Sequence, residues 1–169
     1  MNELYTRVSS TTKQVLYQFM KDQDISLLNY HFDYYFQFCI QENSIQVLPH
    51  HFSNHKIEGL TVVDELGTSF SYERDNPKVK RNFTLCHELG HFILNHEGAY
   101  FAESVDNQED ILEREANIFS AIVLMPDIVL LSKIYYSCET FYQIQNSLGV
   151  SKQALFFRLL DFLREYYSG

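Results

Sequence analysis

The feature that most constrains the fold is HELGH, His87 to His91, inside the apolar segment RNFTLCHELGHFILNH, residues 81–96. In a helix, residues four apart lie on one face, so both imidazoles can reach one metal ion at about 2.0–2.1 Å. The apolar neighbours predict that this helix is buried, where two unpaired histidines and a glutamate would be costly. The motif therefore predicts a metal site on a buried helix, with His87 and His91 as ligands.

Glu88 lies next to the first histidine and is predicted to be the general base. A metal ion held by neutral nitrogens lowers the pKa of a coordinated water towards about 7. Glu88 could then accept the proton of that water and pass it to the leaving amine of a peptide bond.

Gly90 lies inside the same predicted helix, where glycine costs about 1 kcal/mol relative to alanine. Two explanations fit the sequence equally well. Either the substrate or another backbone approaches closely at this position, or the helix packs tightly against a neighbour.

A third ligand has to come from outside the motif. The metzincin pattern would place glycine and histidine at positions 94 and 97, where this chain has Leu94 and Glu97. A carboxylate from a later helix, predicted over 108–124, would instead complete the His₂Glu set of catalytic zinc. The candidates are Glu109, Asp110, Glu113 and Glu115. Glu113 and Asn117 are four apart, so one could bind metal while the other holds a histidine, but periodicity does not separate Glu113 from Glu115.

Together, RNFTLCHELGHFILNH and EREANIFSAIVLMP (113–126) resemble the ImmA/IrrE family of metallo-endopeptidases. Ser120 and Val123 stand where alanine and leucine are common in that family, and neither changes a ligand. The resemblance decides against Glu115. It implies one Zn²⁺ per chain, with site residues His87, His91 and Glu113 as ligands, Glu88 as the catalytic residue, and Asn117 supporting the ligands.

The same resemblance implies a zincin-like α+β fold and a regulatory role. Many members of the family cleave a helix-turn-helix repressor and release expression of a mobile element, phage or stress operon. We therefore expect a zinc endopeptidase whose partner is such a repressor. The alternative is a metal-stabilised module that inactivates the repressor by binding alone, without proteolysis.

Composition limits the other classes of function. The chain has 169 residues and a net charge of −9, which argues against a broad basic surface for nucleic acid. Its three cysteines form no CxxC pair, as is typical of a reducing compartment. The first residues lack the apolar core of a signal peptide, and the apolar stretches look too short for a membrane span. We expect a cytoplasmic protein that binds neither membrane nor nucleic acid directly.

Hydrophobic periodicity predicts an α+β fold, with a small, mostly antiparallel sheet followed by a helical C-terminal half. A strand over 44–48 should stop at Pro49, and 57–64 and 68–73 should form a hairpin around Gly67. We expect one domain over 1–169, comprising N-terminal helices and sheet (1–76), metal-site helices (77–126) and C-terminal helices (127–169). Helices are predicted over 10–21, 27–40, 77–96, 108–124, 127–136, 139–148 and 151–166.

Four further expectations rest on weaker patterns. His50, His51 and His55 are close in sequence but lack a companion ligand at standard spacing, which favours a surface loop. Residues 141–163 look like a helix-turn-helix unit, yet packing is favoured over DNA contact because only Lys152, Arg158 and Arg164 are basic. The strand 68–73 is a candidate to hold an extended substrate. Candidates to stabilise the oxyanion are His96, Tyr100, Tyr135 and Tyr136.

Overall fold

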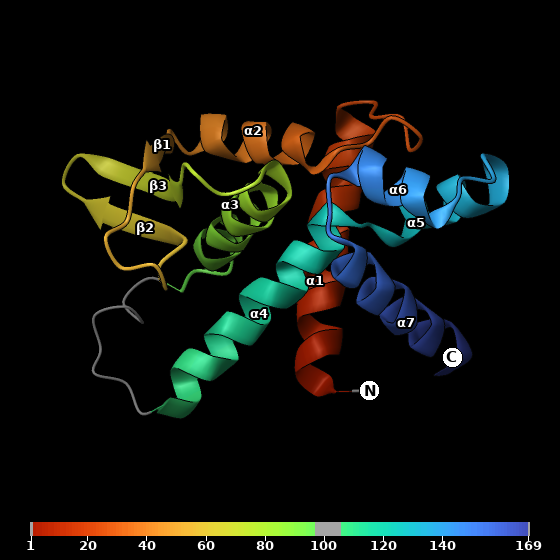
Figure 1. Ribbon diagram of the computed structural model, residues 1–169. Coiled ribbons are helices and arrows are strands. Elements are labelled where there is room, and N and C mark those ends of the chain that lie inside the picture. The colour runs from red at the N-terminus through yellow and green to blue at the C-terminus, as the bar shows by residue number, and fades with distance from the viewer. Residues whose placement is uncertain (1, 97–105, 169) are drawn as a thin grey trace.

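Two helices, α3 (Lys78–Ile93) and α4 (Asp106–Leu124), pack against each other at the centre of the fold (Figure 1). The computed structural model describes residues 2–96 and 106–168. Helix α1 (Glu3–Asp22) packs on α4, and α2 (Phe32–Glu42) lies near one end of α3. A small sheet lies beside α3 at one side of the molecule, and the C-terminal helices lie at the other. The fold is thus a mixed α and β one, as predicted.

The sheet has three strands in the order β1-β3-β2, formed by β1 (Gln46–His50), β2 (Gly59–Asp64) and β3 (Gly67–Glu73). The hairpin between β2 and β3 is antiparallel, as predicted, but β1 runs parallel to β3, with Gln46 opposite Ser69. The sheet is therefore mixed, and the expectation of a mostly antiparallel sheet is corrected. Because β3 is paired on both edges, residues 68–73 offer no free edge to a substrate, so that expectation was wrong.

Strand β1 does not stop before Pro49, since Pro49 and His50 continue the pairing opposite Tyr72 and Glu73. Proline has no N–H to donate to a neighbouring strand. It is tolerated here because β1 is an edge strand, where one row of backbone groups needs no strand partner.

The helix ends differ from the predicted ones where a local cap decides them. Asn2 accepts the Leu4 N–H at 3.1 Å, so α1 begins well before the predicted start at Ser10. His31 caps α2, which begins later than predicted, at Phe32. Helix α3 ends at Ile93 instead of about 96, and Asn95 follows with a positive φ of 59°. Gly98, a residue type that often ends a helix and would follow the predicted helix 77–96, lies outside the described residues.

The C-terminal part contains α5 (Asp127–Leu131), a π-helical turn (Ser132–Tyr136), α6 (Phe141–Leu148) and α7 (Lys152–Ser168). A short turn after Leu148 joins α6 to α7, so the two form a helix-turn-helix arrangement, as the sequence predicted. Gly149 ends α6 with φ of 66°, a conformation that suits glycine, and the Ser151 hydroxyl accepts the Ala154 N–H at 3.1 Å.

The stretch Asp110–Tyr136 is long and apolar enough to cross a membrane by length and composition, contrary to the sequence analysis. In the fold, 61% of its most apolar window is buried, and a core helix passes the same test. Pro126 interrupts the stretch between α4 and α5. Its apolar side chains, such as Phe119, Val123 and Leu130, belong to the hydrophobic core.

Phe70 anchors the sheet to the helices. Its side chain is fully buried on β3 and contacts Phe36 of α2 and Phe92 of α3, with ring centroids 6.4 and 6.2 Å away. Aromatic rings in such contacts bury large apolar areas. The sheet is thereby held against the helix that carries the histidine motif.

Arg158 ties α7 to the turn between α4 and α5. Its side chain is buried, its Nε donates to the Met125 carbonyl at 3.1 Å, and it forms an ion pair with Asp127. Asp127 also pairs with Lys13 of α1 at 2.5 Å. One of the three basic side chains considered for DNA contact therefore has a structural role inside the fold.

Replacing Arg158 by alanine should lower the free energy of unfolding by about 3 kcal/mol, because the buried Met125 carbonyl loses its donor and Asp127 keeps only Lys13 as a partner. Arg164→Ala is the matched control: its side chain is 75% exposed and pairs with Asp161, so stability should change by no more than about 0.5 kcal/mol. Urea unfolding of both variants measures the difference. Equal losses would contradict the structural role of Arg158.

Candidate metal centre

Three candidate ligands converge between α3 and α4. His87 and His91 lie one turn apart on α3, and Glu113 faces them from α4. The Nε2 atoms of the two histidines are 3.0 Å apart, and the Glu113 carboxylate oxygens lie 3.0 Å from His87 Nε2 and 3.1 Å from His91 Nε2. The structure thus brings together the three side chains that the sequence predicted as ligands, all within 4.8 Å of one another.

The donor set fits a divalent metal ion. Ligands at about 2.0–2.1 Å from a tetrahedral zinc are themselves about 3.3 Å apart, close to the separations of these three atoms. Two imidazole nitrogens and one carboxylate form one of the ligand sets that proteins use for catalytic zinc, in which the fourth position stays open.

Electrostatics at the cluster favour a cation. Hydrogen bonds and charge from His87 and His91 hold the pKa of Glu113 well below its usual range, so the carboxylate is ionised. Burial alone would lower the pKa of His87, but the hydrogen bond and charge of Glu113 outweigh it and raise that pKa. The carboxylate therefore supplies the negative charge that a metal ion at this position requires.

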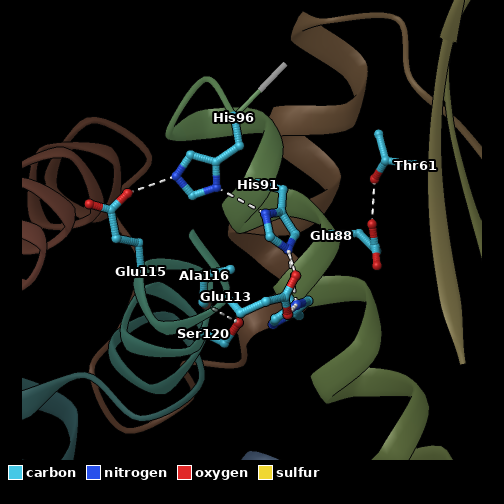
Figure 2. Close-up of polar contacts among 9 residues, drawn as sticks. Thr61, Glu88, His91, His96, Glu113, Glu115, Ala116 and Ser120 are labelled. Atoms are coloured by element: carbon cyan, nitrogen blue, oxygen red, sulfur yellow. Dashed lines mark hydrogen bonds and ion pairs between the residues drawn. The ribbon is translucent and has the colours of Figure 1, made fainter. Parts of the chain in front are cut away.

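Glu88 lies beside the cluster and is held by the sheet. Its side chain is largely buried, and the Thr61 hydroxyl of β2 donates to its Oε2 at 2.5 Å (Figure 2). Burial raises the pKa of Glu88, while the Thr61 hydrogen bond and the neighbouring imidazoles oppose the rise. A raised carboxyl pKa suits a group that accepts and returns a proton near neutral pH. Thr61 was missed from the sequence, where nothing links it to Glu88.

Gly90 is explained by the close approach of α4, not of a substrate. A Cβ at this position would lie 3.3 Å from the Ala116 backbone and 3.0 Å from a ring carbon of Phe119. Both distances are too short for an unstrained contact. The absent side chain thus lets the two ligand-bearing helices pack tightly, and the closely approaching backbone is that of Ala116.

An open cleft of about 540 Å³ leads to the cluster. Its floor is formed by side chains of α3 and α4, and its rim by the segment 56–61, which includes the start of β2. Because β2 is an edge strand, this rim presents backbone groups that no strand of the described sheet pairs. The cleft can therefore admit an extended chain next to Glu88.

The other carboxylates considered as ligands lie elsewhere. Asp110 is 67% exposed and pairs with Arg114, and the side chain of Glu109 lies outside the described residues. Glu115 points to a different side of α4, as expected for residues two apart and about 200° around a helix. There it contacts His96 and Arg7.

Asn117 lines the cleft together with His87, and its side chain is among the groups that raise the pKa of that histidine. His87 Nδ1 itself is buried and has no hydrogen-bond partner among the described residues. The supporting role predicted for Asn117 therefore stays a prediction.

The described oxyanion candidates do not line the cleft. His96 faces away from it, towards His91 and Glu115, and Tyr135 and Tyr136 are exposed on the π-helical turn. Tyr100 lies outside the described residues.

The histidine-rich loop has a companion pair of carboxylates that its spacing did not reveal. His51 Nδ1 lies 3.3 Å from Glu73 and 3.1 Å from Asp75, and these three could also hold an ion. Glu73 in addition accepts the Phe52 N–H at 2.9 Å, which lowers its pKa. His51 and Asp75 are largely exposed. The contacts of Glu73 with His51 and with the Phe52 N–H connect the loop to β3, which explains the cluster without an ion.

Cys86, next to His87, takes no part in the cluster. Its thiol is completely buried on the side of α3 that faces α4, 4.0 Å from the Ser120 carbonyl. Burial raises the pKa of this thiol well above its usual range. The thiol is therefore not an additional ligand.

One family model matches the part of the chain that contains the cluster. The family model of the IrrE N-terminal-like domain (Peptidase_M78) matches residues 40–160. This range contains the sheet, α3 and α4, whereas α1 lies outside it. No curated protein matches the chain.

Gly59→Ala should lower the free energy of unfolding by about 1–3 kcal/mol, because the added Cβ would lie 2.5 Å from Thr84 Cγ2 and 3.0 Å from Glu88 Oε1. Thr84→Ser, which removes the closest atom, should restore about half of the loss in the double variant. Urea unfolding of both single variants and the double variant measures the coupling. Strictly additive losses would contradict a steric contact between β2 and α3.

Proposed function

Because the chain belongs to the IrrE N-terminal-like family of metallopeptidases, we propose that it is a zinc-dependent endopeptidase that cleaves a specific protein. One observation carries the proposal: His87, His91 and Glu113 converge beside the buried Glu88, at the floor of an open cleft. The small sheet beside a helix with HExxH supports a zincin-like fold for this family member.

Metal binding, proton transfer and orientation of the base are each assigned to different residues in this proposal. His87, His91 and Glu113 would hold one Zn²⁺, which when bound polarises the scissile carbonyl and lowers the pKa of water. Glu88 accepts a proton as the water oxygen bonds to the carbonyl carbon. It returns that proton to the amide nitrogen as the carbon–nitrogen bond breaks. Thr61 orients Glu88 from β2 through its hydroxyl.

The free edge of β2 is the proposed binding site for the substrate backbone. The Glu73 N–H donates to the Glu58 carbonyl at 2.9 Å. Because backbone groups alternate along an antiparallel pair, those of Gly59 and Thr61 then face away from β3. An extended peptide could pair with them and pass next to Glu88, as in recognition by strand addition.

A helix-turn-helix transcriptional repressor is the proposed substrate. This part of the proposal rests on the resemblance of the two motifs to proteases that cleave such repressors. The alternative, a module that inactivates the repressor by binding alone, needs the same fold and metal ion but not the proton transfer by Glu88. A substitution at Glu88 therefore separates the two functions.

Protein purified without chelators should contain about one zinc per chain, and Glu88→Gln should retain it, because Glu88 is not a ligand. Cleavage of a helix-turn-helix repressor substrate should slow by at least about 100-fold in this variant. Glu42→Gln, the same change at the exposed end of α2, is the matched control. Elemental analysis and electrophoresis of the repressor measure both quantities.

Undiminished cleavage by the zinc-loaded Glu88→Gln protein would contradict the role of Glu88 as general base. If this variant no longer cleaves but still relieves repression in a reporter assay, binding without proteolysis is the function. A chain that takes up no zinc even when zinc is added would contradict the metal site itself.

A further inference from the structure

A hydrogen-bond network of buried side chains connects His91 to His96 and Glu115 (Figure 2). His91 Nδ1 lies 2.9 Å from His96 Nδ1, and His96 Nε2 lies 2.8 Å from a carboxylate oxygen of Glu115. Arg7 of α1 forms an ion pair with the other oxygen of that carboxylate. His91, His96 and Glu115 are all at least nine-tenths buried, whereas the Arg7 side chain is 64% exposed.

In this hydrogen-bond network, the donor and acceptor of each bond can be assigned in only one way. An ionised carboxylate only accepts, so Glu115 accepts from Arg7 and from His96 Nε2–H. A neutral His96 that carries its hydrogen on Nε2 has a lone pair on Nδ1. That lone pair can only accept, so the hydrogen between the two rings belongs to His91 Nδ1. His91 Nε2 is then left with a lone pair, and this is the atom that faces His87 and Glu113.

We propose that His96 and Glu115, with Arg7 at the outer end, are positioning residues that hold His91 as a metal ligand. They fix its ring orientation and keep its hydrogen on Nδ1, so that Nε2 can bind the ion. Partners of this kind change metal affinity by about 10–100-fold. The inference rests on the proposed function in so far as that function needs a metal ion at His91.

The two histidine ligands differ in this respect. His87 Nδ1 is buried without a hydrogen-bond partner among the described residues, whereas His91 Nδ1 has His96. His91 is therefore the ligand whose orientation the fold determines before an ion binds. Arg7, at the outer end of this hydrogen-bond network, belongs to α1. It lies outside the range of the family match.

Zinc dissociation constants, measured on the full chain by competition with a chromophoric chelator, test the proposal. His96→Phe fills the space but offers no acceptor, and it should weaken zinc binding by about 10–100-fold. Glu115→Gln keeps the shape but lets the amide present its donor to His96, and it should weaken binding by about tenfold. Arg7→Met should have an effect of less than about fivefold, because its ion pair is exposed. Glu139→Gln, at the ion pair with Lys133, should have none.

A rescue variant distinguishes a hydrogen-bonding role from mere packing. In His96→Asn, the amide oxygen can replace Nδ1 as acceptor for His91, so this variant should bind zinc about tenfold more tightly than His96→Phe. If His96 only filled space, His96→Phe would bind zinc more tightly than His96→Asn, because phenylalanine packs better in a buried site. Thermal unfolding of the metal-free variants verifies that each one folds.

Wild-type affinity in His96→Phe, or equal affinities in the Phe and Asn variants, would overturn the proposal even if the protein cleaves its repressor. A wild-type chain that binds no zinc would overturn it as well. If the expected order of affinities is found but the zinc-loaded protein cleaves no repressor, the positioning role stands and the proposed peptidase function fails.

Discussion

The close contact between α3 and α4 at Gly90 sets the geometry on which the candidate site depends. Gly90 directly precedes His91, and Ala116, which it faces, lies one turn after Glu113. A Cβ at position 90 would require Phe119 or the Ala116 backbone to shift by a few tenths of an ångström, on the helix that carries Glu113. A metal site tolerates displacements of only about 0.2 Å in its ligands, so this packing contact has chemical consequences.

Each of the two helices uses different faces for different tasks. On α3, His87 and His91 face the cleft, while Cys86 and Leu89 belong to the core. On α4, Glu113 and Asn117 face the cleft, while Phe119 and Val123 lie in the core. Glu115 occupies a third face and contacts His96. The sheet adds Thr61, so the site combines groups from three parts of the chain.

Features fixed by local sequence could be predicted well. The helix of the HExxH motif, the hairpin around Gly67 and the two helices within 141–163 follow from periodicity and from turn residues. Contacts between distant segments could not be predicted in this way. The parallel pairing of β1 with β3 depends on how the chain returns to the sheet, and the bond from Thr61 to Glu88 depends on how the sheet docks on α3. Glu115 and His96 were both considered, but in other roles, because sequence spacing does not say which face of a helix meets which neighbour.

The burial of Cys86 has a consequence for the redox behaviour of the protein. Oxidants attack the thiolate form of an accessible cysteine, and the thiol beside His87 is neither ionised nor exposed. Cys39 is buried in the same way, whereas Cys138 is exposed and lies in the C-terminal part, away from the cleft residues. Oxidative stress would therefore modify Cys138 first. The candidate centre, which has only nitrogen and oxygen ligands, contains no group that such oxidation would convert.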